Sequence, residues 1–351
     1  MVALLFTWMS VGQTRTELRI AEQGQITNRF NAAVQNLGSK SVDVRFGGIY
    51  ALQRIMQDSP RDQPGIVSVL CAYVRQNAPV PAQGFDKLNE DELLGDRNTG
   101  PRTDITAVIT VLNDRPPEHD RETLLDLSGA ELRHVGLSGP SRGANLGDAD
   151  LRAAFLAGDL REAFFGDANL SRATVDDANL TRSYFGWANL ASTSATGSSF
   201  ARADFTEANM RDADFSGTRA FSNDLTRAVF FGTDMRGTWL DGAKLADAIF
   251  VNADLSGADL IGANLHGARF SAADKRLEDV LGAELEPDAH ASLKSADLTE
   301  ADLTNADLRG VDLSGADLTG ADLRGARLNG AKLAGATTTG ARGLPRALHP
   351  S

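Results

Sequence analysis

Residues 161–190 read REAFFGDANL SRATVDDANL TRSYFGWANL, and the same pattern returns every five residues. An apolar residue stands at every fifth position from Phe155 to Phe270, which makes 24 positions without an interruption. The residue two places before it is usually alanine, and the residue just before it is often Asp or Asn. A helix has a period of 3.6 residues and a strand a period of 2, so this spacing fits neither. It predicts a chain that turns a corner after every unit, with the alanine and the Leu or Phe pointing inward.

The unit A-(D/N)-(L/F)-x-x, as in Ala168-Asn169-Leu170, resembles the pentapeptide-repeat family. The resemblance implies a mainly β fold, a right-handed quadrilateral β-helix with four units in each coil, preceded here by a small all-α module. Coils would stack about 4.8 Å apart through backbone hydrogen bonds, so residues twenty apart should share a column. The sequence then predicts two columns of stacked rings: Phe165, Phe185 and Phe205, and Phe230, Phe250 and Phe270.

The regularity of the repeat changes in two places. The period first appears in another phase, at Leu127, Leu132 and Leu137, so we expect a one-residue slip and a bulged corner near Phe155. The unit weakens after Phe270, which predicts a protruding loop before the clean repeat returns. The predicted parts are an apolar segment at 1–12, a helical module at 13–115, a linker at 116–125, a β-helix at 126–336 that is weak or looped at 274–292, and a tail at 337–351.

Residues 1–12 are apolar but too few to span a membrane, which takes about 20 apolar residues in a helix. They also lack the basic start and the small-residue cleavage site of a signal peptide. Three alternatives stay open: a helix packed on the protein, a peripheral membrane anchor, or the end of a transmembrane helix that begins upstream of Met1. The third rests on resemblance, because many proteins that share the next module have transmembrane helices before it. We expect a cytoplasmic protein, free or held at the cytoplasmic face of the membrane.

Apolar residues at helical spacing predict an all-α module. Gly47 and Gly48 lie near the start of one predicted helix; each costs about 1 kcal/mol relative to Ala, so the pair predicts a close helix crossing. The motif VRFGGIYAL at 44–52 resembles a module that precedes pentapeptide repeats in many actinobacterial proteins. The predicted helices are Ile26–Leu37, Val44–Met56, Pro64–Val74 and Thr103–Leu112, with Thr103 as the cap of the last.

Charge and composition restrict the classes of function. The formal net charge is −12, and residues 126–351 carry 22 basic and 32 acidic side chains, which argues against direct binding of nucleic acid. The single Cys71 excludes an internal disulfide and suits a reducing compartment. The five histidines have no metal-ligand spacing, and no phosphate-binding loop or nucleophile elbow appears. We therefore predict no enzyme activity, and no catalytic, cofactor-binding or metal-binding residue.

The sequence favours a protein–protein interaction scaffold, membrane-associated if residues 1–12 are an anchor. Its partner is an unidentified protein, and the terminal coil, which has no obvious cap, suggests a homodimer as a further arrangement. The alternative is an acidic regulator of a topoisomerase, because the quinolone-resistance members of the family inhibit DNA gyrase by mimicking DNA. Interspersed arginines and the additional helical module weaken that analogy. The predicted interaction surface consists of Asp297, Asp302, Asp307, Asp312, Asp317 and Asp322, which occupy the same place in six successive units, and of Arg29, Arg45 and Arg54.

Overall fold

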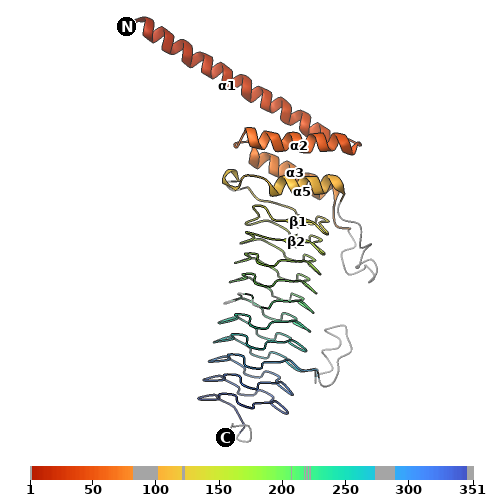
Figure 1. The fold of residues 1–351 in the computed structure, drawn as a ribbon, viewed down its shortest axis with the longest axis vertical. Helices are drawn as coiled ribbons and strands as arrows, with labels where there is room; N and C mark the ends of the chain where they lie inside the picture. The colour runs from red at the N-terminus through yellow and green to blue at the C-terminus, as the bar shows by residue number, and fades with distance from the viewer. Residues whose placement is uncertain are drawn as a thin grey trace. The chain divides into compact units, whose positions relative to one another are not determined.

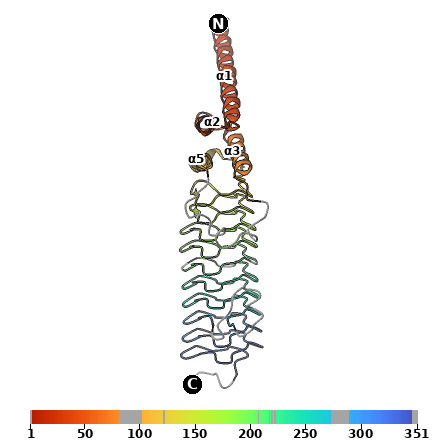
Figure 2. The ribbon, with the colours of Figure 1, turned by 90° about the vertical axis from the view of Figure 1, so that its right-hand side faces the viewer.

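The computed structural model describes residues 2–81, 102–120, 123–206, 208–216, 218, 220, 223–272 and 289–345. The chain divides into two compact units. The first, called the helical unit, takes in residues 1–74 and 102–123. The second, called the tube, takes in residues 75–101 and 124–351. Figures 1 and 2 show the helices of the first unit and the stacked coils of the second.

Four α-helices lie in the described part of the N-terminal region, and each contains one of the predicted helices. They are α1 Val2–Leu37, α2 Val42–Asp58, α3 Gln63–Asn77 and α5 Thr103–Asn113, and a short 3-10 helix, η1 Pro117–His119, follows. α1 is longer than expected, because the apolar segment at its start belongs to the same helix. The predicted cap of α5 is wrong by one residue: Arg102 is the N-cap and Thr103 is already helical. No helix in the described ranges is apolar over enough length to cross a membrane.

α1 and α2 cross closely at Gly48. A Cβ atom on Gly48 would lie 2.7 Å from the carbonyl oxygen of Ala33 and 3.0 Å from Cβ of Asn36, so a larger residue would push the helices apart. Gly47 is different, because no atom lies within 4 Å of its Cβ position. The predicted close crossing is therefore confirmed at Gly48 and wrong for Gly47.

In the tube, each unit of five residues forms one parallel bridge to the next coil. From Asp159 onward, bridged partners are twenty residues apart, as in Phe164 and Tyr184, except across the predicted loop, where Asp254 bridges to Ser292. Two backbone hydrogen bonds flank that bridge: the N–H of Phe165 donates to the carbonyl of Tyr184 at 2.7 Å, and the N–H of Tyr184 donates to the carbonyl of Ala163 at 2.9 Å. A coil contains four such bridges, so the bridged positions form four ladders that run along the tube. We name them, after their members in one coil, the Asp159, Phe164, Asn169 and Thr174 ladders.

The corner of each unit lies two residues after its buried Leu or Phe. The backbone there adopts the left-handed conformation, with φ of 56° at Asp167 and 61° at Arg172. Most residues avoid this conformation, whereas Gly, Asn and Asp tolerate it best. One left-handed residue in every five therefore turns an extended segment into the side of a coil, which is the physical reason for the period.

The inward side chains form the columns that the sequence predicts. Phe165, Phe185 and Phe205 stack with ring centroids 4.6 Å apart at each step. The second predicted column stacks at 4.8 Å and 4.7 Å. Each of these rings is at most 1% exposed, so each contributes about 1.5–3 kcal/mol of burial free energy. Both predicted columns are confirmed.

The predicted slip lies between Leu156 and Leu160. Leu156 is buried whereas Phe155 is 50% exposed, so the prediction that Phe155 points inward is wrong. The unit from Leu156 to Asp159 has four residues, and bridges that begin before it join residues nineteen apart, as in Phe155 and Thr174. The coil is thus shortened by one residue.

The tube continues beyond the limit that the repeat pattern suggests. Asp322 bridges to Arg342, six residues past the predicted end at residue 336. Asp254 bridges to Ser292, so the coils on either side of the predicted loop are neighbours. The loop itself falls largely at 273–288, outside the described residues, as do the last residues of the tail.

The two adjacent glycines of α2 should respond to alanine in opposite directions. Gly47→Ala should raise the free energy of unfolding by about 1 kcal/mol, because alanine favours a helix and has open space there. Gly48→Ala should lower it by about 1–3 kcal/mol, because the added methyl group meets the backbone of α1. Urea denaturation followed by circular dichroism at 222 nm measures both. An equal effect of the two substitutions would contradict the close crossing at Gly48.

Candidate interaction surfaces

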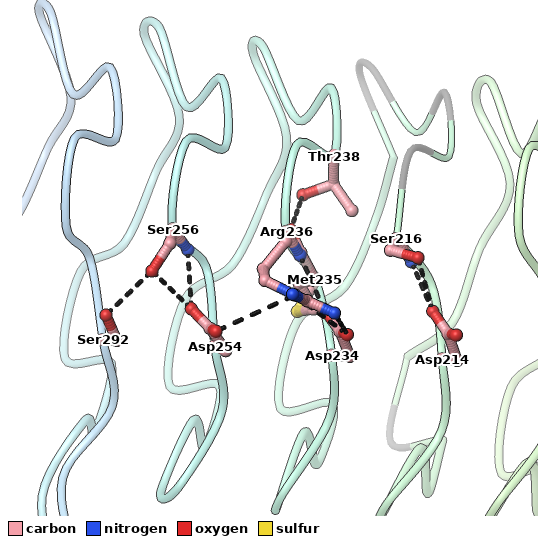
Figure 3. A network of polar contacts seen from close by, with 9 residues as sticks. All are labelled: Asp214, Ser216, Asp234, Met235, Arg236, Thr238, Asp254, Ser256 and Ser292. Atoms are coloured by element: carbon pink, nitrogen blue, oxygen red, sulfur yellow. Dashed lines mark hydrogen bonds and ion pairs between the residues drawn. The ribbon is translucent and has the colours of Figure 1, made fainter.

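The Asp and Asn residues of the repeat have a structural role in every ladder, which Figure 3 shows for the Thr174 ladder. Oδ1 of Asp214 accepts a hydrogen bond from the N–H of Ser216 at 2.9 Å, and Oδ1 of Asp254 accepts one from the N–H of Ser256 at 3.0 Å. Asn169 makes the same bond. The side chain thus accepts the one N–H of the unit that the backbone hydrogen bonds, within and between coils, leave over.

The six predicted aspartates are distributed over all four ladders. Asp297 bridges to Asp317 and Asp302 to Asp322, as expected for residues twenty apart. The pairs lie on the Asp159 and Phe164 ladders, whereas Asp307 belongs to the Asn169 ladder and Asp312 to the Thr174 ladder. The six carboxylates therefore surround the tube and do not form one continuous acidic track.

Arginines neutralise part of this acidity. Arg309 donates to both carboxylate oxygens of Asp307, at 2.7 Å and 2.5 Å, and Arg324 binds Asp322 in the same way. The hydrogen bond from Arg324 lowers the pKa of Asp322, and a hydrogen bond from Thr319 lowers that of Asp317. Asp317 and Asp322 therefore stay charged at neutral pH. Of the six aspartates, Asp307 and Asp322 are paired with a guanidinium that offsets their charge.

The three predicted arginines of the helical unit differ in accessibility. Nε of Arg45 donates to Asp104 at 2.7 Å and its Nη1 donates to two backbone carbonyls that follow α1, so this partly buried side chain is bound to its own unit. Arg29 binds Asp58 through both terminal nitrogens at 3.0 Å at a partly exposed site. Arg54 is exposed. Arg45 therefore joins α2 to α5 and to the residues after α1, whereas Arg29 and Arg54 are more exposed.

Asp104 is the centre of a buried ionic cluster. Its side chain is 1% exposed, and Oδ2 accepts hydrogen bonds from the hydroxyl of Tyr73 and from Nη2 of Arg102, both at 2.6 Å, in addition to Arg45. Burial favours a higher pKa for Asp104, but the hydrogen bonds from Tyr73, Arg102 and Arg45 outweigh it and lower the pKa to about 2. Burial and the bond to Asp104 raise the pKa of Tyr73 to about 12.

An exposed aromatic surface on the tube was not predicted. Phe164 and Tyr184 are neighbours in one ladder, with ring centroids 5.0 Å apart and planes at 9°. Phe164 is 44% exposed, and Trp187, at the corner after Tyr184, is 55% exposed. We call these three residues the aromatic surface. A signal was available in the sequence, because an aromatic residue stands where the unit normally has Asp or Asn.

Within the described ranges, no group of three or more His, Cys, Asp or Glu side chains is placed to hold a metal ion. Cys71 is buried, in agreement with a small apolar role in α3.

Comparison with known proteins identifies the repeat. Eight copies of the family model described as pentapeptide repeats match residues 183–219, 240–274 and 296–335. The crystal structure of HetL, a pentapeptide repeat protein involved in heterocyst differentiation regulation from the cyanobacterium Nostoc sp. strain PCC 7120, is 29% identical with a TM-score of 0.52. The match covers 62% of this chain and 90% of HetL. The chain belongs to the pentapeptide-repeat family.

Two further solved structures are similar to this pentapeptide-repeat chain. A second pentapeptide repeat protein from Nostoc PCC 7120 is 34% identical over 31% of this chain and 78% of its own, with a TM-score of 0.23. QnrB1, a plasmid-mediated fluoroquinolone resistance protein, is 21% identical over 48% of this chain and 87% of its own, with a TM-score of 0.32. No match was found among curated proteins.

Acid should destabilise the helical unit of this pentapeptide-repeat protein through Asp104. The folded pKa of about 2 lies below the ordinary value of 3.8, so the unfolded chain takes up the proton first. The stabilisation is therefore complete above about pH 4 and is lost as the pH falls towards 2, a loss of about 2 kcal/mol. Urea denaturation at several pH values, followed at 222 nm, measures it.

Two variants serve as controls for this pH dependence. Tyr73→Phe removes one hydrogen bond to Asp104, raises its folded pKa and should reduce the loss in acid. Asp58→Asn removes the exposed partner of Arg29 and should change stability by less than about 1 kcal/mol. If Tyr73→Phe keeps the pH dependence of the wild type, Asp104 is not its source.

Proposed function

We propose that this protein is a non-enzymatic scaffold that binds a protein partner along the outer surface of its tube, a right-handed quadrilateral β-helix. The observation that carries the proposal is the exposure of large aromatic side chains on a regular backbone: Phe164, Trp187 and Trp239 are 44%, 55% and 51% exposed. The free energy of the complex falls when a partner covers such side chains. Because backbone bonds between coils fix their positions, little order is lost on binding.

The relationship with HetL supports a role of this kind. HetL is a pentapeptide repeat protein involved in regulation, and the match covers 90% of its length. A repeat tube that acts in regulation presents side chains to other molecules along its outer surface. The same use of the surface is our proposal for this chain.

The proposal includes a location in the cytoplasm, at the cytoplasmic face of the membrane. Residues 1–12 would provide the attachment, since a peripheral helix binds a membrane surface without spanning it. The apolar sequence of this segment supports the idea. The partner would then be a protein found at that surface.

A second proposal is the regulation of a topoisomerase by mimicry of DNA. It rests on the stacked pairs Asp297 with Asp317 and Asp302 with Asp322, which place like charges one coil apart. The pairing of Asp307 and Asp322 with arginines weakens it. We regard it as the less favoured of the two.

For the scaffold, we expect a photo-crosslinking residue on the tube to capture a protein in the native host. Crosslinkers at Asp148, Trp239 and Asp317 test three surfaces of the tube separately, and mass spectrometry of the soluble and membrane fractions identifies the captured protein. Capture above the level of an untreated sample at one position or more is the expected result. Its absence at all three positions in both fractions would contradict the scaffold.

The same experiment with a chain lacking residues 1–12 tests the location. Loss of these residues should move the protein from the membrane pellet to the soluble fraction, because the apolar attachment is gone. Unchanged pelleting would contradict the anchor and leave the scaffold proposal intact.

If the second proposal holds, the full chain inhibits DNA supercoiling by gyrase. Replacing Asp302, Asp307, Asp312 and Asp317 together by Asn should abolish the inhibition, because the charge disappears. Asn keeps the turn bond, as Asn169 does, so the fold should persist, which thermal unfolding checks. The inhibition should also fall with added salt. Unimpaired supercoiling at high concentrations of the wild type would rule out the mimicry.

A further inference from the structure

We infer that the aromatic surface, formed by Phe164, Tyr184 and Trp187, is the docking site for an arginine-containing segment of a partner protein. The inference rests on the proposed scaffold function and adds the site and the chemistry of the partner. It depends on three features of the structure: the cost of the aromatic surface to the repeat, the space made for its rings, and the charges around it.

The first feature is the backbone hydrogen bonding that the repeat loses where aromatic residues replace Asp or Asn. Elsewhere on the Phe164 ladder, Asn145 and Asp204 accept a hydrogen bond from the N–H two residues on, at 3.2 Å and 2.8 Å. Phe164 and Tyr184 lie between them in the ladder and have no acceptor to offer that N–H. Trp187 has φ of 58°, in the left-handed region that a bulky side chain rarely adopts. The repeat therefore has aromatic residues at positions where Asp, Asn or Gly would suit the backbone better.

The second feature is the space. Gly147, Gly166 and Gly186 lie against the two rings, and a Cβ atom on Gly166 would be 2.6 Å from Cζ of Phe164 and 3.0 Å from Cε1 of Tyr184. On Gly186 it would be 2.3 Å from the phenol oxygen of Tyr184. The rings therefore lie against bare backbone, and this allows them to stack while Phe164 stays 44% exposed.

The third feature is the charge. Asp148 and Asp167 occupy the corner position of Trp187 in the two preceding coils and are exposed, and Asp204 follows Tyr184 in the ladder. Burial raises the pKa of Tyr184, and the negative charges of Asp204 and Asp167 raise it further, so these carboxylates act directly on the phenol.

The corner that precedes the aromatic surface carries Glu162 between two arginines. Arg142 lies 3.1 Å and Arg182 3.7 Å from this carboxylate, so the three form one chain of ion pairs. The carboxylate of Glu162 is thus already paired with arginines of the tube. The corner with Asp148 and Asp167 instead presents carboxylates beside exposed rings.

A guanidinium group suits this combination because its flat face stacks on an aromatic ring while its N–H groups bind carboxylates. The tube itself contains an example: Cζ of Arg211 lies 4.8 Å above the ring of Phe231. The net negative charge of residues 126–351 also attracts a basic segment. A lysine ammonium ion lacks the planar face and should bind less well.

The test uses the full chain and two synthetic peptides, one of alternating Gly and Arg and one of alternating Gly and Lys, at physiological salt. Titration calorimetry should give an affinity for the arginine peptide at least about tenfold higher than for the lysine peptide. Phe164→Asn with Tyr184→Asn should remove this preference. These substitutions restore the residue type of Asn145, so the melting temperature should not fall. Trp187→Gly should weaken binding while raising the melting temperature, because it relieves the left-handed strain.

Trp239→Asn is the matched control, since Trp239 is similarly exposed but belongs to another ladder. It should leave the preference for arginine unchanged. Equal affinities for the two peptides, or a preference that survives the double Asn substitution, would overturn the inference. So would a wild type that is dimeric in sedimentation velocity and becomes monomeric in Trp187→Gly, since the occupant would then be a second copy of the chain. Capture of a partner from Asp317 or Trp239 but not from Asp148 would leave the scaffold standing and remove only this docking site.

Discussion

The backbone hydrogen bonds between successive coils are the constraint on which the tube depends. They use the N–H and carbonyl groups on both sides of each bridge, as at Tyr184, and they fix the spacing of every inward and outward side chain. Two N–H groups in each unit lie outside this pattern. The alanine N–H donates to the carbonyl three residues back, as from Ala213 to Met210, and the Asp or Asn side chain accepts the other, as Asp214 does for Ser216. The acidic surface is therefore first a consequence of how a five-residue unit satisfies its own backbone. Any use of that acidity in binding is additional.

The sequence predicted the fold because period, column and ladder are all local properties of the repeat. The stacked rings of Phe165, Phe185 and Phe205 follow from the twenty-residue coil alone. The coil length alone does not show which of Phe155 and Leu156 points inward, since both are apolar and adjacent. This was decided by the bridge of Phe155 to Thr174, nineteen residues away, which places Leu156 inside. A change of phase in the repeat is visible in a sequence, but the bonds to the neighbouring coil determine the residue at which it occurs.

The candidate sites were harder to predict than the fold, because they depend on contacts between distant residues. Asp104 meets Arg45 across 59 residues and Tyr73 across 31, and no spacing indicates such a cluster. The sequence around Arg45 therefore does not reveal its pairing with Asp104. The aromatic surface has another reason for being hard to predict: Phe164 and Tyr184 each precede an inward Phe, and the apolar pattern alone does not distinguish an outward ring from the inward ring beside it. An aromatic residue in the Asp or Asn position is a departure from the repeat, and it indicates a feature that the fold does not require.

Unusual residues at the inward positions differ from the outward aromatic residues, because they weaken the packing inside the tube and expose no side chain. Where Thr replaces the inward alanine, its hydroxyl usually finds a carbonyl: Oγ1 of Thr233 donates to Met210 at 2.7 Å. Thr218 and Asn223 are equally buried, yet Oγ1 of Thr218 and Nδ2 of Asn223 have no partner among the described residues. Both line a cavity beside Ala220, which stands where most units have Leu or Phe.

Each unpaired group costs about 1–3 kcal/mol. In a stack whose stability is a sum over neighbouring coils, this cost falls on one coil and lowers the cooperativity between the coils on either side of it. The aromatic surface lies in the earlier coils and the stacked Asp pairs in the later ones, so the two candidate surfaces belong to parts of the tube that this weak coil separates.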